Sequence, residues 1–328
     1  MTNNPIAVVM ADLHFNINNI DVASTALSVA IDKANDLGVT LIIAGDLHDT
    51  KAIIRAEVSN RLLELFSKAN DKPIILIGNH DLINEKSSDH ALNFLSVGCT
   101  VISGVCHTNG ISFIPYQSDP KKFINTVNTL DTRNIVICHQ GFKGASMGDY
   151  VKDESSVDPM LLKSYKFISG HYHKHQILGN VTYVGSPYTV SYGEANDGPK
   201  GFLILFEDGT FEQEVISVRK HLIIEYKPEE GPIKIKKGQI RKDDLIWVKV
   251  FGPMSVIQKV KREDLIKDVF HGINIKLSYH SSPHNCKHIV NHQEDKLTHG
   301  ELLDKIIDNS EETKERKTDL KATWRKLI

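Results

Sequence analysis

The sequence predicts an α/β fold, and three observations lead to that prediction. Short apolar runs at residues 6–10, 40–44 and 74–77 have the length of buried strands. The segments between them carry apolar residues at helical spacing. Each run also stops at a polar motif. Strands that alternate with helices imply βαβ units and a largely parallel sheet covered on both faces.

Two helices are expected between these three strands. The first has a stripe that ends before Gly38, a natural C-terminal stop, and comprises Ile20, Ala23, Leu27, Ala30, Ile31, Ala34 and Leu37. The stripe of the second comprises Ile54, Val58, Leu62, Leu65, Phe66 and Ala69. Later strands are expected at 111–114, 134–138, 166–169, 181–184, 202–206 and 211–217. Gly-Asn at 179–180 and Asp-Gly at 208–209 predict tight turns between strands.

The composition predicts a large domain with smaller additions. A chain of 328 residues is long for one core. The first domain is expected at 1–218, followed at 219–292 by a small α+β domain rich in lysine and β-branched residues, with a helical stretch around 254–270. Residues 293–328 are charged and helix-prone, with apolar stripes that must be buried against a partner or against their own domain.

The sequence contains no membrane span and no signal peptide, because no apolar run approaches 18 residues and the N-terminus lacks a basic region. Four scattered cysteines are typical of reduced thiols, which predicts a cytoplasmic protein. The formal net charge of −2 counts weakly against a nucleic-acid partner. Bound cations would offset acidic ligands, and a basic surface can exist within a neutral total.

Five polar motifs carry the chemistry. They are Asp12-Leu13-His14, Gly45-Asp46-Leu47-His48-Asp49, Gly78-Asn79-His80-Asp81, Cys138-His139-Gln140 and Gly170-His171-Tyr172-His173. The carboxyl ends of strands in an open α/β sheet gather in one crevice, so motifs spread over 160 residues can converge. Carboxylate, amide and imidazole ligands suit manganese, iron or zinc. Seven candidate ligands exceed the needs of one metal, and they predict two metals that share a bridging carboxylate.

These motifs, in this order and spacing, resemble those of the calcineurin-like metallophosphoesterase family over residues 5–205. The resemblance implies a β-sandwich flanked by helices. It implies that one metal is held by Asp12, His14, Asp46 and His173, and the other by Asp46, Asn79, His139 and His171. It also implies that His80 stands beside the scissile phosphate as general acid or charge stabiliser, that Asp81 orients His80, and that Asp49 supports the phosphate pocket.

A second segment narrows the resemblance within that family. Tyr183 to Glu194, followed by Lys200-Gly201-Phe202, is similar to the SbcD-type nucleases, and is most similar to their phage members, the T-even type recombination endonuclease subunits. The resemblance implies a manganese-dependent nuclease that degrades double-stranded DNA from 3′ to 5′ and cuts single strands internally. It further implies a homodimer, a small domain that caps the nuclease and touches DNA, and an SbcC-type coiled-coil ATPase bound by residues 293–328. Such a complex acts in recombination, repair or replication.

Several motifs have a structural alternative. His48 and His175 lie near the ligands but outside the expected set. The group His284, Cys286, His288 and His292 has the content of a metal site without a trusted spacing. The lysine-rich run 234–242 is a phosphate-contacting patch or a solvated strand face. Tyr188 and Tyr192 stack on bases or pack their own loop.

Two other functions remain open from the sequence. A small-molecule phosphodiesterase or phosphoprotein phosphatase of the same fold would hydrolyse nucleotides or phosphopeptides without DNA. A non-catalytic subunit would recruit an ATPase and hold DNA ends, and would lack metal-dependent hydrolysis. The complete set of seven ligands favours an active enzyme.

Overall fold

The fold was analysed in a computed structural model that describes residues 3–49, 51, 53–84, 89–148, 151–235, 239–281, 307–308 and 314–324. The chain divides into two compact units, residues 1–282 and 283–328. In the second unit the described part is the helix α7 (Lys314–Trp324) with residues 307–308. The expected boundary at 292/293 lies outside the described residues. All the features below belong to the first unit.

One six-stranded sheet has the order β12-β11-β1-β2-β3-β4. Strands β1 to β4 are parallel, and β11 pairs with β1 in the antiparallel sense. The strands are β1 (Pro5–Met10), β2 (Thr40–Ile43), β3 (Ile74–Leu76), β4 (Thr100–Ile102), β11 (Gly201–Phe206) and β12 (Phe211–Val215). The parallel order places the ends of β1, β2 and β3 side by side, which brings the first three motifs together.

A second six-stranded sheet has the order β5-β6-β7-β8-β10-β9. Its central strands β6, β7 and β8 are parallel, so the last two motifs also leave one edge. The strands are β5 (Cys106–Thr108), β6 (Ile111–Ile114), β7 (Ile135–His139), β8 (Lys166–Gly170), β9 (Gln176–Leu178) and β10 (Val181–Tyr183). The two expected turns join antiparallel neighbours, β9 to β10 and β11 to β12.

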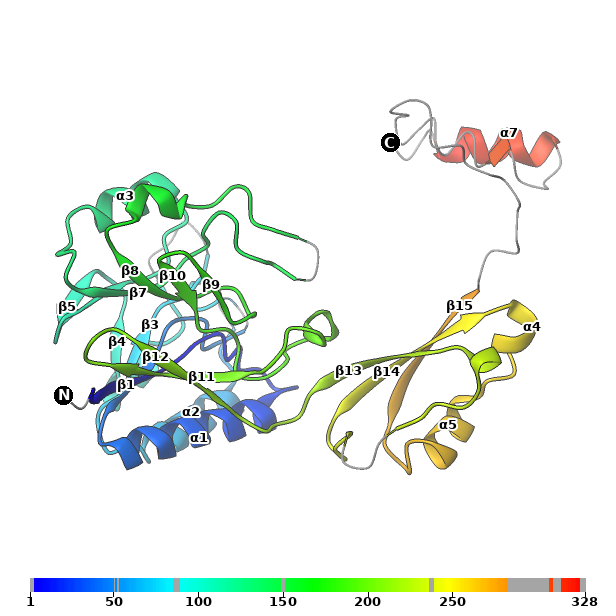
Figure 1. The fold of residues 1–328 in the computed structure, drawn as a ribbon, viewed down its shortest axis with the longest axis horizontal. Coiled ribbons are helices and arrows are strands. Elements are labelled where there is room, and N and C mark those ends of the chain that lie inside the picture. Colours follow the sequence, from blue (N-terminus) through cyan, green and yellow to red (C-terminus); the bar gives the residue numbers. More distant parts are fainter. Residues whose placement is uncertain are drawn as a thin grey trace. The chain divides into compact units, whose positions relative to one another are not determined.

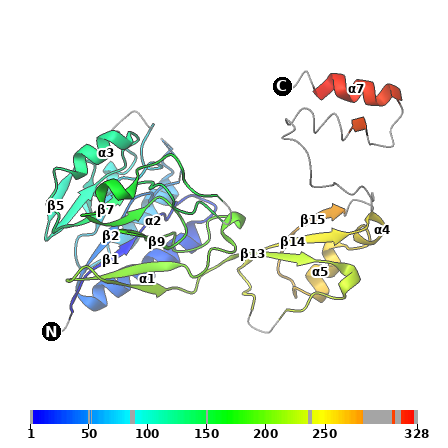
Figure 2. The same ribbon diagram turned by 45° about the horizontal axis from the view of Figure 1, so that its top comes forward.

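The two sheets pack face to face between helices (Figures 1 and 2). Successive side chains of β1 point to opposite faces of the sheet and show this layering. Val8 and Met10 pack with the helices α1 (Ile20–Leu37) and α2 (Ala56–Phe66). Ala7 and Val9 pack with the second sheet. The outer face of the second sheet is covered by α3 (Pro120–Val127). Each sheet thus has one face on helices and one on the other sheet, which confirms the expected sandwich flanked by helices.

Short 3₁₀ turns lie in the connecting segments. They are η1 (Asn93–Val97), η2 (Pro159–Leu162), η3 (Tyr192–Glu194) and η4 (Pro228–Glu230). Of these, η3 matters most for the site, because it lies in the segment that follows the last motif and it also touches β13.

A third sheet follows residue 218. It has the order β13-β14-β15, all parallel, with β13 (His221–Tyr226), β14 (Leu245–Gly252) and β15 (Ile275–Ser281). The helices α4 (Met254–Ile257) and α5 (Arg262–Asp268) pack with it around an apolar cluster of its own. A separate core is what a distinct α+β domain needs.

Two expected helices differ in extent. The stretch 254–270 is not one helix, because Gln258 ends α4 and Lys261 is extended, at φ −99° and ψ 141°. This break lets the side chain of Val260 pack on the third core. The second early helix begins at Ala56 and leaves Ile54 exposed. In both cases the helical spacing of apolar residues in the sequence continues past the ends of the helices in the structure.

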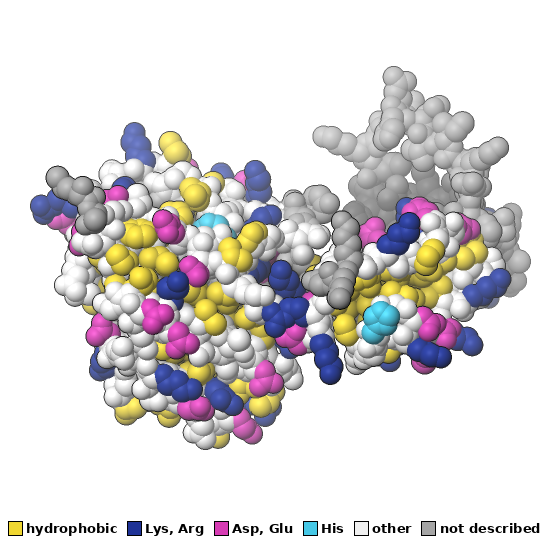
Figure 3. All heavy atoms as spheres, turned by 60° about the horizontal axis from the view of Figure 1, so that its bottom comes forward, with side chains coloured by type: hydrophobic (Ala, Val, Ile, Leu, Met, Phe, Trp, Pro, Cys, Tyr) yellow, Lys and Arg dark blue, Asp and Glu magenta, His cyan; other side chains and the backbone are white. Residues whose placement is uncertain are grey.

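Among the residues that the structure describes, no helix is long and apolar enough to cross a membrane. Side chains of both charges are interspersed over the face drawn in Figure 3. That mixture fits the small formal net charge of −2.

Candidate metal centre

The five motifs converge at the carboxyl ends of β1, β2, β3, β7 and β8. Three groups of candidate ligands have atoms within 4.8 Å of one another: Asp12 with His14 and His173, His14 with Asp46 and His80, and Asp12 with Asp46 and His139. Asp12, His14, Asp46 and His139 are buried. The remaining ligand candidates, Asn79, His171 and His173, are half-buried. The cluster thus has a closed floor and a more accessible rim.

The backbone is bent sharply at these ligands. Asp12, His14, Asp46 and His171 have positive φ angles of 54°, 46°, 51° and 92°. Side chains other than glycine seldom adopt this region, and outliers of this kind gather at functional sites. The bends turn the side chains that follow the strands into a common space.

Three glycines let the strand ends approach closely. A Cβ added to Gly78 would lie 2.2 Å from Asp46 Oδ1 and 2.4 Å from the Asp46 backbone nitrogen. A Cβ on Gly45 would lie 2.2 Å from His139 Nδ1, and one on Gly170 would lie 2.5 Å from the Ala44 carbonyl oxygen. Each glycine of the motifs therefore makes room for a ligand or for the backbone beneath it.

One set of ligand atoms forms around His14 and His173. Their Nε2 atoms are 3.0 Å apart, and His14 Nε2 lies 3.7 Å from Asp46 Oδ2. Asp12 lies in the same group. A second set forms around Asn79, whose Oδ1 lies 3.1 Å from His139 Nε2 and 2.9 Å from His171 Nδ1. Asp46 Oδ2 is 3.2 Å from His139 Nε2 and so borders both sets.

These spacings fit metal coordination. Ligands about 2.1 Å from a metal and at right angles to each other lie about 3.0 Å apart. The closest atom pairs are also between residues expected to share a metal, and the carboxylate expected to bridge lies between the sets. The donor set of carboxylate, amide and imidazole suits a pair of divalent first-row cations.

Hydrogen bonds fix which imidazole nitrogen faces the cluster. His139 Nδ1 lies 2.8 Å from the Ala44 carbonyl oxygen, which only accepts, so Nδ1 carries a proton and Nε2 is the nitrogen that faces the cluster. His173 Nδ1 is 2.8 Å from Glu194 Oε1, which leaves its Nε2 toward His14. Partners of this kind orient metal-binding histidines and raise their basicity.

The electrostatics of the metal-free cluster are those of a cation site. Burial opposes the charge of Asp46, but His139 and next His14 outweigh burial and lower the pKa of Asp46. Burial also works against a charged His139, yet Asp46 raises the pKa of His139 to about 9. Burial, with the charge of His139 second, lowers the pKa of His171 to about 3. Without a cation, the charged Asp46 carboxylate is therefore paired with protonated His139, and a bound cation would replace that proton.

His80 lies at the rim of the cluster. Its backbone N–H donates to Asp46 Oδ1 at 2.8 Å, and its ring Nδ1 lies 3.0 Å from the carbonyl oxygen of Asp49. The carbonyl only accepts, so Nδ1 donates and Nε2 is the nitrogen that can take up or release a proton. The Asp49 carboxylate faces His14 instead, with Oδ1 3.4 Å from His14 Nδ1.

Asp81 has different partners from those expected. It was expected to orient the His80 ring, but its Oδ1 accepts from the His48 backbone N–H at 2.9 Å and its Oδ2 from that of Gly78 at 2.8 Å. The ring of His80 is held by a backbone carbonyl instead. Asp81 is fully buried, and burial, followed by the nearby Asp46 charge, raises its pKa to about 7. Asp81 therefore ties the second motif to the third.

One functional group was not singled out from the sequence. Glu194 holds His173 through Oε1 and receives three hydrogen bonds at Oε2, from Lys200 Nζ at 3.0 Å, Ser186 Oγ at 3.1 Å and the Val190 backbone N–H at 3.1 Å. Both charged residues are buried, with side chains that are 11% exposed for Glu194 and 7% for Lys200. The only signal in the sequence was their presence in the segment that carries the nuclease resemblance.

The side chains with alternative interpretations are placed as follows. His48 is buried, and His175 is held by the Tyr183 carbonyl oxygen at 2.8 Å, so neither lies among the ligand groups. Tyr188 is 1% exposed and donates to the Leu13 carbonyl oxygen, so it packs its loop. Tyr192 contacts the third sheet. The group at residues 284–292 lies outside the described residues.

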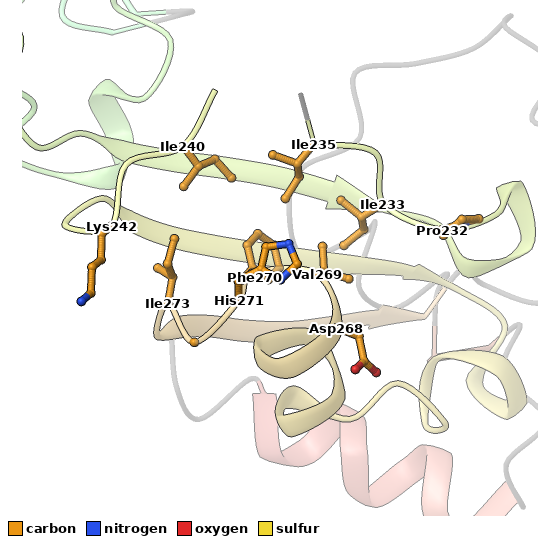
Figure 4. A pocket seen from close by; sticks show the side chains of 11 residues that line it. Pro232, Ile233, Ile235, Ile240, Lys242, Asp268, Val269, Phe270, His271 and Ile273 are labelled. Atoms are coloured by element: carbon orange, nitrogen blue, oxygen red, sulfur yellow. The ribbon is translucent and has the colours of Figure 1, made fainter. Parts of the chain in front are cut away.

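A cavity of about 1050 Å³ lies away from the ligands, in the third-sheet region (Figure 4). It is lined by Pro232, Ile233, Ile235, Ile240, Lys242, Asp268, Val269, Phe270, His271, Gly272 and Ile273. Its walls are mostly apolar. The cavity therefore does not compete with the metal centre as the site of chemistry.

Similar proteins agree with the geometry of the site. The family described as calcineurin-like phosphoesterase matches residues 7–175, which contain all seven ligand candidates. The protein described as putative phosphoesterase 244L of Invertebrate iridescent virus 6 is 26% identical over 69% of this chain and 84% of its own length. Exonuclease subunit 1 of Enterobacteria phage T4 is 26% identical over 67% of this chain and 68% of its own length.

Among solved structures, an archaeal phosphodiesterase aligns with 64% of this chain and 99% of its own, at 16% identity and a TM-score of 0.34. The stronger result is the family match, which covers more than half of the chain and includes all five motifs. This match confirms the predicted fold and a metal-dependent phosphodiester hydrolase. The chain belongs to the calcineurin-like phosphoesterase family.

Proposed function

We propose that this protein is a two-metal DNA nuclease. The observation that carries the proposal is that seven candidate ligands lie close together in two groups with Asp46 next to both, in a chain similar to a phage exonuclease subunit. One cation would be held by Asp12, His14, Asp46 and His173. The other would be held by Asp46, Asn79, His139 and His171.

Divalent cations held in this way supply Lewis-acid chemistry, in that they acidify water and stabilise negative charge at phosphorus. The residues of the chain supply order and proton transfer. Glu194 and the Ala44 carbonyl oxygen hold two imidazoles in the ligating tautomer. His80, fixed through Nδ1, presents Nε2 to the leaving oxygen and donates a proton to it.

The substrate in this proposal is DNA, cut from 3′ to 5′ at double-stranded ends and internally in single strands. Manganese is the proposed cation, since nitrogen and oxygen ligands without thiolate accept it. The proposed work of the protein is end processing in recombination, repair or replication. A small domain at 219–292 would contact the DNA beside a nuclease domain at 1–218.

The proposed complex contains two copies of this chain and an SbcC-type ATPase. The phage T4 relative is called a subunit of an exonuclease, and this supports a larger assembly. The ATPase would bind residues 293–328, of which the structure describes α7 and residues 307–308. Co-purification of a tagged full chain with such an ATPase, and its loss on deletion of 293–328, would support this part. Undiminished co-purification after the deletion would contradict it.

The decisive experiment measures cleavage of end-labelled double- and single-stranded DNA with manganese. Wild type, His80→Ala and the control His107→Ala are compared. His107 is an exposed histidine that contacts Ser112, outside the ligand groups. We expect His80→Ala to lower cleavage by about 10²–10⁴-fold while cations still bind, because it removes proton transfer. The control should cleave like the wild type.

The same proteins are given bis-p-nitrophenyl phosphate, a generic diester. Turnover of this diester with intact DNA would contradict the nuclease and favour a small-molecule phosphodiesterase. Full DNA cleavage by His80→Ala would overturn the role given to that residue. No metal-dependent hydrolysis of either substrate would favour the non-catalytic subunit.

A further inference from the structure

The outer face of the third sheet differs from its inner face. Along β14, Ile246, Val248 and Val250 are buried in the domain core. The alternate residues Trp247, Lys249 and Phe251 point to the opposite face and are only half-buried. The register sets β15 residues beside them: Lys276 pairs with Trp247, Ser278 with Lys249, and His280 with Phe251.

Trp247 is the centre of this face. Lys276 Nζ lies 4.1 Å and Lys249 Nζ lies 4.5 Å from its ring centroid. Its Nε1–H donates to Ser278 Oγ at 2.9 Å, which fixes the plane of the indole. The Tyr192 ring meets it edge-on at 5.5 Å. Trp247 is not part of the apolar core of the domain. Its indole is held in place on the outer face of the sheet, with both ammonium groups over the ring.

The charges of this face favour an anionic partner. A hollow of about 530 Å³, lined by Tyr192, Arg262 and Lys276 among others, adjoins it. Arg262 is held over the hollow by the Ile275 carbonyl oxygen at 2.8 Å and by Asn274. The opposing charge in the same register is Glu225, which pairs with Lys249 across β13 and β14. The two cations at the Trp247 ring, Lys249 and Lys276, favour a phosphate chain as the partner, and Glu225 is the carboxylate paired with one of them.

We propose that this face, defined by Trp247, Lys249, Phe251 and Lys276, is a stacking platform for single-stranded nucleic acid. A flat ring on an open sheet can stack only with a base whose face is uncovered, and in a duplex both faces are covered by neighbouring pairs. The two lysines over the ring have flexible stems, so a base that stacks on the ring displaces their ammonium groups toward its phosphates. The inference rests on the proposed nuclease function, and it specifies where an unpaired strand is held.

The platform is connected with the metal centre through one short segment. Tyr192 touches Trp247, and its ring also meets His221 at 4.7 Å. Two residues further, Glu194 holds His173. Thr189 fixes the start of β13 by accepting from the His221 backbone N–H at 2.7 Å. A strand on the platform is thus in contact with the segment that supports a metal ligand.

The test uses the fluorescence of Trp247 in the full chain. The sequence has two tryptophans, so Trp324→Phe leaves Trp247 as the single reporter. The protein is titrated with single-stranded oligothymidylate and with a blunt duplex of equal length, in chelator so that nothing is cleaved. We expect saturable quenching by the single strand, at least tenfold tighter than by the duplex. Equal quenching by both, or none while anisotropy reports binding, would overturn the platform.

Charge variants test the phosphate contacts. Lys249→Gln with Lys276→Gln should reduce the slope of log affinity against log salt by about 1.4, because each lost single-strand phosphate contact removes about 0.7. An unchanged slope would contradict the role of the two lysines. Tyr279→Ala is the control. Tyr279 is an aromatic residue of β15, the strand of Lys276, and it is 49% exposed. It follows Ser278 directly, so its side chain points to the opposite face of the sheet. It should leave both slope and quenching unchanged.

Turnover separates this inference from the nuclease proposal. In Trp247→Ala, we expect about a tenfold rise in KM for single-stranded DNA, with kcat and turnover of bis-p-nitrophenyl phosphate unchanged. An unchanged KM would overturn the platform. If the wild type fails to cut DNA but single strands still quench Trp247, the platform stands and the nuclease proposal falls. Normal diester turnover also shows that the variant is folded around its metal centre.

Discussion

At the scale of single residues, Glu194 determines how one metal ligand is presented. Its two oxygens are divided between His173 and a set of donors led by Lys200. A buried carboxylate without these donors would be costly, and a buried lysine without the carboxylate equally so. The pair therefore stabilises the loop and aims the imidazole at the same time.

Replacing Glu194 by glutamine should make stability less dependent on acid pH. Burial opposes the charge, but His173 and Lys200 outweigh it and lower the pKa of Glu194 from 4.5 to about 2. A lowered folded pKa gives stability that is present above pH 4.5 and is lost as pH falls toward 2. In urea unfolding we expect Glu194→Gln to cost about 1–3 kcal/mol at pH 7.

At pH 2 to 3 the difference between Glu194→Gln and the wild type should shrink to a fraction of that at pH 7. A difference that stays constant over this range would show that the carboxylate charge is not what the loop needs. The same variant should bind metal more weakly at pH 7, since such supporting groups typically contribute about 10–100-fold in affinity.

The convergence of the candidate ligands was predictable from the sequence, because they lie at or shortly after the ends of short apolar strands. Asp12, Asp46, Asn79 and His139 are adjacent to strand ends, where a parallel sheet collects them. Glu194 was not predictable in its role, because it lies in a 3₁₀ turn of three residues, which is too short to show a periodic pattern. Nor do residue identities reveal the positive φ angles of the ligands.

At the scale of elements, the strand ends are spaced by glycines. Gly78 stands against Asp46, where any Cβ would overlap both a carboxylate oxygen and a backbone nitrogen. The close approach of β2 and β3 at this point places Asn79 and Asp46 in one cluster. The motif glycines are thus a condition for the geometry of the centre, since a side chain at Gly78 would collide with Asp46.

Gly78→Ala should displace Asp46 and weaken cation binding at least tenfold, with a loss in stability of about 1–3 kcal/mol from overpacking. Calorimetric titration with manganese and urea unfolding measure the two effects. Gly98→Ala is the control, because its added Cβ would meet nothing within 4 Å and its φ is −124°. Wild-type affinity in Gly78→Ala would contradict the close-packing argument.

Element types were predicted better than element ends. Hydrophobic spacing identified α1 and its stop at Gly38, which has the left-handed φ of 64°. The break between α4 and α5 was missed because apolar residues continue across it and Val260 satisfies the third core from an extended segment. Short strands such as β4 and β5, with three residues each, are too brief for a reliable pattern.

At the scale of the molecule, the third sheet has a core of its own, whereas the metal centre is built on the first two sheets. Its apolar cluster consists of residues after 218. The connections to the rest that the structure describes include Thr189 with His221 and Ser217 with Arg241. Damage to this core should therefore be felt locally before it reaches the metal centre.

Ile246→Ala should cost about 2–5 kcal/mol in the stability of the third sheet, because Ile246 is 1% exposed. We expect faster amide hydrogen exchange over 245–281, with unchanged turnover of a generic diester. Ile177→Ala, at a position 64% exposed on β9, should change stability by less than about 0.5 kcal/mol. If Ile246→Ala lost diester turnover to the same degree as stability, the two parts would form one cooperative unit.

The central claim is that seven ligands hold two cations around Asp46. The most direct measurement is the number of manganese ions bound per chain, from the free-ion paramagnetic resonance signal during titration of the wild type and of Asn79→Ala. We predict that the wild type binds two ions and gives a spin-coupled signal at saturation. We predict that Asn79→Ala binds one ion tightly. A single ion in the wild type, or two uncoupled ions unaffected by Asn79→Ala, would contradict a shared two-metal centre.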